Sequence, residues 1–411
     1  MDYRVLMTLV SELGSHLAVA GAETYRIEES IIRVLHTYRL EGRVYSVPNS
    51  LFITIMVPDQ LPVTQLCRMD DLGIDLDAVE KYSNVSRRIC SEKPDPQTAL
   101  QWLRDAEHDR KQYSFPTVLL GHILVAGGLC VFYGGSAADC GCAALCGLFL
   151  GFVDKWLSRV NSNAFFQKIT SAFLMALFAY LLAEFGLSDC IDTSVIGTLM
   201  LLVPGLLFTN ALRDIMFGDT NSGVNRVVTT LLLASAVALG TAAAWNSAEY
   251  LWGIPAAAQP LVHSDLMGCT ATLVSCIGFL FVWNIHGSGA ILCAVGGFLT
   301  WAVFCLTDRF GAGYPMCCLV GTLAAATYAE IMARIRKYPA ISYLVVSLVP
   351  LIPGSYIYYT AQQAVLGNMD GFLYQGVQTL ITAGVMAVGI ILISSTFRIL
   401  HPRHLPHGNH K

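Results

Sequence analysis

The sequence predicts a polytopic α-helical membrane protein, with about ten transmembrane helices in two inverted five-helix repeats behind a small cytosolic α/β (α+β) domain. Of the 411 residues, 55% are hydrophobic and only 13% are charged, whereas soluble domains carry about 25% charged residues. The charges are concentrated early: residues 1–115 hold 17 acidic and 13 basic side chains, and residues 116–411 hold 12 of each. Finally, Pro204-Gly205 and Pro353-Gly354 interrupt apolar stretches at matching positions of the two halves.

Residues 1–113 are predicted to form the soluble domain. Apolar residues recur at helical spacing in residues 1–38, which predicts two helices. Residues 43–57 are rich in β-branched and aromatic residues, a composition typical of strands, with a turn near Pro48-Asn49. Residues 75–90 and 96–111 are predicted to be further helices. The N-terminal residues interleave charged with apolar side chains and give no signal-peptide core, so we expect this domain to stay in the cytosol.

Ten apolar stretches approach the roughly 20 residues that a helix needs to cross a membrane. The first membrane half, residues 114–245, contains the stretches 116–136, 138–157, 164–186, 191–211 and 224–244. The second half, residues 266–397, contains 266–283, 288–306, 314–333, 338–359 and 372–396. Residues 246–265 are the predicted extracytoplasmic linker, and residues 398–411 are the predicted cytosolic tail.

Basic residues predict the orientation of these spans, because cytosolic loops carry the excess of Lys and Arg. With a cytosolic N-terminal domain, eleven of the twelve Lys and Arg residues after residue 115 fall in inner loops or the tail, and only Arg309 falls outside. Both termini are therefore predicted to be cytosolic. Since each half has an odd number of spans, the second half enters from the opposite face, which predicts inverted repeats.

The two proline–glycine pairs lie in the fourth span of each half. Proline removes a backbone donor and glycine lets the chain leave helical geometry. Within lipid, such a break is tolerated only where protein or a water-filled cavity satisfies the freed groups. Each following half-helix would present a positively polarised N-terminus near the bilayer midplane, where it can receive a carboxylate. Paired breaks of this kind indicate the central site of a transporter, while a simple kink is the alternative for each proline.

Polar residues near the breaks are the other candidates for the transport site. Asn210, Arg213 and Asp214 follow the first break, where Arg213 and Asp214 fit an inner gate, a proton-responsive pair or ordinary interfacial anchors. Tyr356 follows the second break and is assigned to the site. The remaining tyrosines assigned to an outer aromatic belt are Tyr358 and Tyr359.

Ionisable groups in or near the membrane are candidates for proton coupling. The candidates are His122, Asp154, Asp214 and Glu330. Glu330 has an alternative role, because Arg334 lies one helical turn further on and would pair with it. A packing role is the alternative for His122.

No cofactor or metal is expected. The sequence has no C-x-x-C pair, and most of its 13 cysteines lie in apolar segments, where cysteine behaves as a small hydrophobe. Pairing stays open for three that would lie near the outer surface, Cys140, Cys142 and Cys190. The histidines of the tail, His401, His404, His407 and His410, fit a short disordered tail better than a metal site.

The expected partners are a small-molecule substrate and the lipid bilayer, and a homo-oligomer is compatible with the sequence. No basic excess suggests nucleic acid. A rival function is a membrane-anchored hydrolase that uses the N-terminal domain, but neither H-E-x-x-H nor G-x-S-x-G occurs. A channel is a third possible function.

One helix of the N-terminal domain has a charged face, which is best explained as a solvated, ion-paired surface or as a contact with the membrane domain. Its residues are Glu23, Arg26, Glu28, Glu29 and Arg33.

Three segments resemble the threonine/serine exporter family. They are GAETYRIEESIIRVL, VPGLLFTNALRDIMFGDTNSGVNRVVTTLLLASAVALG and YAEIMARIRKYPAISYLVVSLVPLIPGSYIYYTAQQAV. The resemblance implies a bacterial inner-membrane exporter that moves threonine and serine by secondary transport coupled to the proton motive force. It carries over Pro204, Gly205, Asn210, Arg213 and Asp214 in the first half and Glu330, Pro353, Gly354 and Tyr356 in the second. Relatives with separate membrane halves are associated with succinate, so a dicarboxylate exporter is the alternative.

Overall fold

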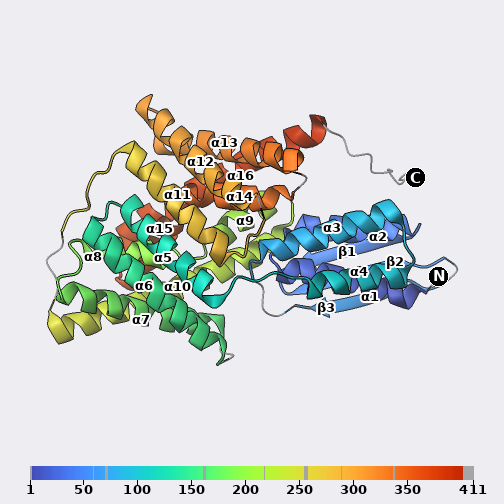
Figure 1. Ribbon diagram of the computed structural model, residues 1–411, viewed down its shortest axis with the longest axis horizontal. Coiled ribbons are helices and arrows are strands. Elements are labelled where there is room, and N and C mark those ends of the chain that lie inside the picture. The colour runs from blue at the N-terminus through green and yellow to red at the C-terminus, as the bar shows by residue number, and fades with distance from the viewer. Residues whose placement is uncertain are drawn as a thin grey trace.

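The computed structural model describes residues 2–58, 60–69, 73–160, 163–216, 218–253, 258–287, 289–336 and 338–400. The four tail histidines lie outside these residues. The N-terminal segment, residues 2–110, packs against one end of a large helical bundle that holds the rest of the described chain (Figure 1).

The N-terminal segment combines four helices with one sheet. The helices are α1 (Tyr3–Val19), α2 (Thr24–Thr37), α3 (Leu76–Glu92) and α4 (Pro96–His108), and the strands are β1 (Glu41–Val47), β2 (Ser50–Met56) and β3 (Val63–Arg68). The sheet is antiparallel in the order β1-β2-β3. Val47 pairs with Ser50 across the tight turn, so the predicted strands and their turn at Pro48-Asn49 are confirmed. The predicted helices are confirmed as well.

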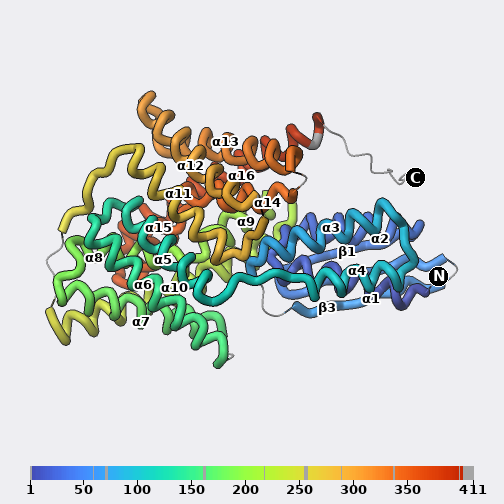
Figure 2. Tube along the Cα trace, viewed as in Figure 1, coloured from blue at the N-terminus to red at the C-terminus, as the bar shows by residue number. Residues whose placement is uncertain are grey.

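The core of this segment lies between the sheet and the helices. Along β2, Leu51 and Ile53 are buried while Phe52 between them is exposed, the alternation expected of a sheet covered on one face. α1 and α2 pack against the sheet (Figure 2). Leu13 and Ile31 on these helices are completely buried. The same cluster of buried apolar residues continues into the bundle, at Leu280 and Ile285.

The bundle confirms a polytopic membrane protein. Eight described helices are long and apolar enough to cross a membrane: α5 (Phe115–Phe132), α6 (Ala137–Ser158), α7 (Ala164–Glu184), α10 (Thr220–Trp252), α11 (Asp265–Val282), α12 (Ala290–Arg309), α13 (Tyr314–Arg336) and α16 (Met369–Leu400). A ninth span is present if α14 (Ala340–Leu348) with the short helix η1 (Val349–Leu351) is joined to α15 (Gly354–Val365), across a 53° bend. The tenth predicted span corresponds to α8 (Ile191–Leu199) and α9 (Gly205–Met216), and its membrane-crossing role stays a prediction.

Equivalent helices of the two predicted halves make equivalent contacts. α7 packs on α10 as α13 packs on α16, and α9 touches α16 as α15 touches α10. α5 and α11 approach closely at two glycines: a Cβ added to Gly121 would lie 2.9 Å from the carbonyl oxygen of Gly278, and one added to Gly278 would lie 2.8 Å from that of Gly121. This pattern is what inverted repeats require, although the inversion itself stays a prediction.

All thirteen cysteines are free. Cys140, Cys142 and Cys190 therefore do not pair with one another. Cys190 instead contacts the carbonyl oxygen of Ala258 through its sulfur at 3.3 Å.

Candidate functional site

Both proline–glycine pairs interrupt helices, and they do so in the same way. The glycine N–H donates to the carbonyl oxygen two residues earlier, and a helix starts directly afterwards. The bonds are Gly205 to Val203 at 2.9 Å and Gly354 to Ile352 at 2.7 Å. The first ordinary helical bonds follow, from Phe208 to Pro204 at 3.3 Å and from Ile357 to Pro353 at 3.0 Å. The N–H groups of the intervening first turn have no intrahelical acceptor.

The two breaks touch each other. A Cβ added to Gly205 would overlap Cγ2 of Ile352 and would lie 3.3 Å from Cα of Gly354. α9 and α15 also contact each other, so their N-terminal ends start side by side. Glycine fits at Gly205 because the side chain of Ile352, together with the close backbone of Gly354, leaves no room for a Cβ.

A single cavity of about 1110 Å³ connects these breaks to the N-terminal segment. Its lining includes Pro204, Gly205 and Gly354 at the breaks and Thr24 and Ser46 in the N-terminal segment. The walls between come from α5, α7, α10 and α11. Two breaks that lie about 150 residues apart in the chain thus border one space.

The cavity carries positive charge. Among the described lining residues the charged ones are Lys168 and Arg226, and no carboxylate is present. The uncharged polar lining residues of the bundle include Asn163, Gln167, Asn210, Asn225 and Thr229. A cavity lined by one sign of charge attracts ligands of the other sign, so this one favours an anionic group.

A buried ion-pair network joins the N-terminal segment to the bundle beside this cavity. Arg213 on α9 pairs with Glu23 at the start of α2, and both side chains are at most 5% exposed. Asp214 Oδ2 lies 3.3 Å from Arg226 Nη1, and Arg226 Nη2 donates to Thr24 Oγ1 at 3.2 Å. The explanation of Glu23 as part of a solvated face is therefore wrong, and the contact with the membrane helices is the right one.

The pKa of Glu23 reflects this network. Burial would raise the pKa of the carboxyl, but the charge of Arg213, assisted by Arg26, outweighs burial and lowers the pKa to about 2. Glu23 is thus ionised throughout the physiological range. Its negative charge permanently faces Arg213, whose Nη2 also lies 3.7 Å from Asp214.

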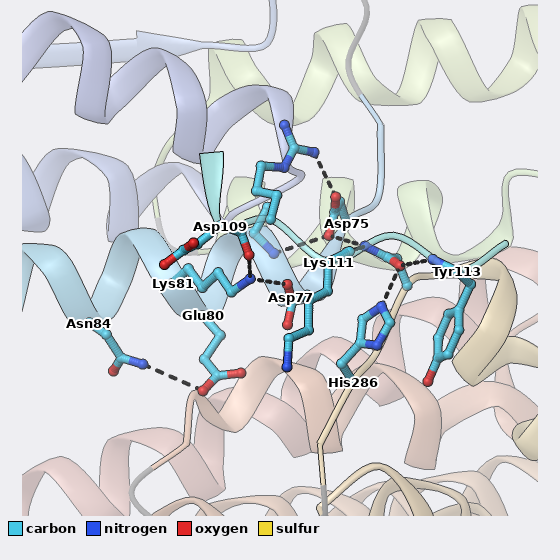
Figure 3. Close-up of polar contacts among 12 residues, drawn as sticks. Asp75, Asp77, Glu80, Lys81, Asn84, Asp109, Lys111, Tyr113 and His286 are labelled. Atoms are coloured by element: carbon cyan, nitrogen blue, oxygen red, sulfur yellow. Dashed lines mark hydrogen bonds and ion pairs between the residues drawn. The ribbon is translucent and has the colours of Figure 1, made fainter. Parts of the chain in front are cut away.

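A second contact surface gathers Asp75, Lys111, Tyr113 and His286 (Figure 3). Asn284, in the turn after α11, joins these residues. Its side-chain amide donates to Asp75 at 3.0 Å and to the carbonyl oxygen of Lys111 at 2.8 Å, and its oxygen accepts from the backbone of Tyr113 at 3.3 Å. Asn284 adopts φ 54°, in the left-handed region that asparagine tolerates. His286 stacks on Tyr113 with ring centroids 3.9 Å apart, and burial lowers the pKa of His286, which favours the neutral ring.

A third contact joins β1 to the start of α10. Asn221 donates to the hydroxyl of Tyr45 at 2.8 Å, and Ser222 donates to the carbonyl oxygen of Ser46 at 3.2 Å. The N-terminal segment is therefore fixed to the bundle at α9, at α10 and at the turn after α11.

The structure brings some, but not all, of the predicted transport residues to the cavity. Those that line it are Pro204, Gly205, Asn210 and Gly354. Pro353 is the neighbour of Gly354 in the chain. Arg213 and Asp214 belong to the ion-pair network. Tyr356 is not a lining residue; its ring packs on Tyr314 with centroids 5.9 Å apart. Tyr358 is only 5% exposed and donates to Thr241 at 3.2 Å, so its assignment to an outer belt is wrong. Tyr359 lies half-buried beside it.

Three of the proton-coupling candidates have ordinary local partners and do not line the cavity. His122 bonds through Nδ1 to the carbonyl oxygen of Val118 at 2.9 Å. Asp154 accepts from Ser171 at 2.7 Å. Glu330 pairs with Arg334, the alternative named for it. Asp214 forms an ion pair with the lining residue Arg226. Asp154 acts electrostatically on the lining residue Lys168 but forms no ion pair with it among the described residues. Within the described ranges, no group of His, Cys, Asp or Glu side chains could hold a metal ion.

Sequence reasoning missed two residues that the structure associates with the cavity. Lys168 lines the wall, although it entered the sequence prediction only as one of the basic residues that indicate orientation. Tyr133 also lines the wall. The available signal was a lysine one turn inside an apolar stretch, where charged groups are usually functional.

Comparison with known proteins gives a consistent result. A family model described as "Putative threonine/serine exporter" matches residues 8–247, and one described as "Threonine/Serine exporter, ThrE" matches residues 269–396. The chain is 22% identical over 419 residues to a "Probable threonine/serine exporter" of Mycobacterium tuberculosis, over 95% of this chain and 76% of that protein. No solved structure matches. Because the first model alone covers more than half of the chain, and the second covers most of the remainder, this protein belongs to the threonine/serine exporter family.

Proposed function

We propose that this protein is a secondary active exporter of small carboxylated metabolites, threonine and serine first, in the bacterial inner membrane. The observation that carries the proposal is the single cavity that reaches both proline–glycine breaks and whose described lining residues include two cations and no carboxylate. Family membership supports threonine and serine as the substrates. The cytosolic orientation of both termini rests on the distribution of Lys and Arg.

The substrate site of the proposal lies where α9 and α15 begin. A carboxylate would accept hydrogen bonds from the free N–H groups of the two first turns, after Gly205 and Gly354, with the positive ends of both helix dipoles behind them. The carbonyl groups freed at the ends of α8 and η1 suit the ammonium group of an amino acid. Such a site binds a zwitterion without any carboxylate side chain, which agrees with the lining of the cavity.

The proposal includes coupling of export to the movement of protons. Asp214 is the best-placed carrier among the four candidates, since it is buried and holds the lining residue Arg226. Protonation of Asp214 would remove the charge that binds Arg226 and would free its guanidinium toward the cavity. Binding of a proton and access to the cavity would thereby be linked.

A dicarboxylate such as succinate is the second candidate, favoured by the positive lining. The charges argue for one carboxylate rather than two. Arg226 is already neutralised by Asp214 at 3.3 Å, which leaves Lys168 as the cation without a partner among the described lining residues. One free cation and two helix N-termini suit a monocarboxylate better than a dianion.

Transport by the purified protein in lipid vesicles tests the proposal. Labelled threonine, serine and succinate are loaded separately, and efflux is measured with and without an imposed proton gradient. We expect gradient-dependent flux of threonine and serine that exceeds that of succinate. The absence of gradient-dependent flux for all three would refute the exporter, and flux that ignores the gradient would favour a channel.

A double substitution tests the site within the same assay. Replacing Pro353-Gly354 by Ala-Ala restores a continuous helix and removes the second free N-terminus, so transport should be lost while the protein still folds. Unchanged transport would mean that the second break is only a kink.

A further inference from the structure

We infer that Lys168 attracts the carboxylate of the substrate into the cavity, on the way to the two breaks, and thereby selects solutes that carry a carboxylate over solutes that lack one. The inference rests on the proposed function and adds a specificity-determining residue to it. Lys168 belongs to the second turn of α7, the helix that also contributes Gln167 to the cavity wall.

The two cations of the cavity differ in their partners. Arg226 is occupied, because it pairs with Asp214 at 3.3 Å and donates to Thr24 at 3.2 Å. Lys168 makes no hydrogen bond and no ion pair within 4.0 Å in the part of the chain that the structure describes. An ammonium group has three donors, so Lys168 retains its full capacity to bind an anion.

Lys168 is partly removed from water. Its side chain is half-buried, and an ammonium removed from water is costly unless a negative partner compensates it. Asp154 on α6 is the carboxylate that acts on it electrostatically. Asp154 is held by Ser171 at 2.7 Å and does not approach within ion-pair distance. A balancing charge is therefore near, while the direct position beside Nζ is left for a ligand.

Lys168 is not a simple interfacial anchor. A lysine near a helix end commonly extends to the membrane surface. Lys155 on α6 has that character, because it is exposed and lies over the ring of Phe115 at 3.5 Å. Lys168 instead lines the cavity, roughly 6 Å along the helix from its start. The two lysines therefore differ in surroundings although both lie at the same end of the bundle.

The strength of a hydrogen bond between the ammonium group of Lys168 and a carboxylate sets the expected specificity. A charge-assisted hydrogen bond contributes about 1.5–3 kcal/mol, which corresponds to roughly a 10- to 100-fold change in affinity. Loss of the ammonium should therefore raise KM for threonine by about that factor and should affect the rate at saturation less. Threoninol, which lacks the carboxylate, would not gain from Lys168.

Full-length variants in lipid vesicles provide the test. Lys168→Gln should raise KM for threonine roughly 10- to 100-fold, Lys168→Arg should keep most of the affinity, and the matched control Lys155→Gln should behave as wild type. Inhibition by threoninol, an ammonium cation without a carboxylate, should not weaken in Lys168→Gln, because it loses no favourable contact with Lys168. If Lys168→Gln has a lowered melting temperature, Lys168→Met, which keeps the length of the side chain, is measured in its place.

Two failures can be told apart. Wild-type protein that moves neither threonine nor serine refutes the proposed function, and with it this inference. A transporting wild type together with a folded Lys168 variant whose KM equals that of Lys155→Gln overturns the inference alone.

Discussion

Replacing Gly205 by alanine tests whether contact between the two breaks governs transport. The new Cβ would overlap Cγ2 of Ile352 and would lie 3.3 Å from Cα and 3.4 Å from the backbone nitrogen of Gly354. Ile352 could change rotamer, but the backbone of Gly354 begins α15 and cannot yield without moving that helix. The substitution therefore pushes the N-terminal ends of α9 and α15 apart.

The magnitude follows from two opposing terms. Overpacking a tight site costs about 1–3 kcal/mol. Alanine recovers up to about 1 kcal/mol over glycine inside a helix, and less at its first residue. A net penalty of about 1–2 kcal/mol remains, which corresponds to a factor of about 5–30 in the population of the arrangement in which both breaks meet. We expect threonine efflux to fall by a similar factor.

The assay compares three alanine variants by initial rate of efflux and by melting temperature. Gly354→Ala should be milder than Gly205→Ala, because its Cβ meets only the flexible end of Met200, at 2.9 Å from the sulfur. Gly384→Ala in α16 is the control, since nothing lies within 4 Å of its Cβ. Wild-type transport and melting temperature for Gly205→Ala would refute the reasoning, as would an equal loss for Gly384→Ala.

Three further predictions concern the contacts around the cavity. Glu23→Gln should destabilise the protein by about 3–5 kcal/mol, seen as a lower melting temperature, because Arg213 loses its buried partner. Folding lowers the pKa of Glu23 from 4.5 to about 2. The contribution of Glu23 to stability is therefore complete above pH 4.5 and is lost as the pH falls from there toward 2. A Glu23-dependent change in stability between pH 5 and 8 would contradict this. Asn284→Ala should lower the free energy of unfolding by about 1–3 kcal/mol, measured by thermal unfolding. Asn284→Gly allows the same backbone angle without the side-chain hydrogen bonds and should recover part of this loss. Full stability of the alanine variant would argue against the Asn284 contact. Tyr358→Phe should cost about 0.5–1.5 kcal/mol and leave KM unchanged, whereas a large rise in KM would place the hydroxyl of Tyr358 in the substrate path.

The features that sequence predicted well are those set by local physics. Long apolar stretches gave the helices of the bundle, and the proline–glycine pairs gave the breaks, because proline and glycine act on the backbone within one turn. Strand β3 was missed for the converse reason. Its residues Val63–Arg68 are mostly exposed and lie at the edge of the sheet, so they show no alternation of buried and exposed positions.

The missed parts of the candidate site depend on distant pairs. Glu23 and Arg213 are separated by 190 positions in the chain, and a single sequence does not show which charges of a helix face will be buried against another segment. Tyr358 illustrates the same limit. A tyrosine near the end of an apolar stretch is typical of an interfacial belt, but here Thr241 on α10 offers a partner inside the bundle.

Proline and glycine have separate tasks at each break, and only their combination produces the cavity end. Pro204 and Pro353 interrupt the helical hydrogen bonds and leave polar backbone groups in an apolar wall, which is costly unless water or a ligand reaches them. Gly205, by contrast, allows close approach, because a side chain there would collide with the opposite break. The freed groups of both halves are thereby gathered at one point rather than at two. Since the cavity reaches that point from the N-terminal segment, the contact between the breaks also brings their backbone donors to the cavity, where we propose that the carboxylate of the substrate binds.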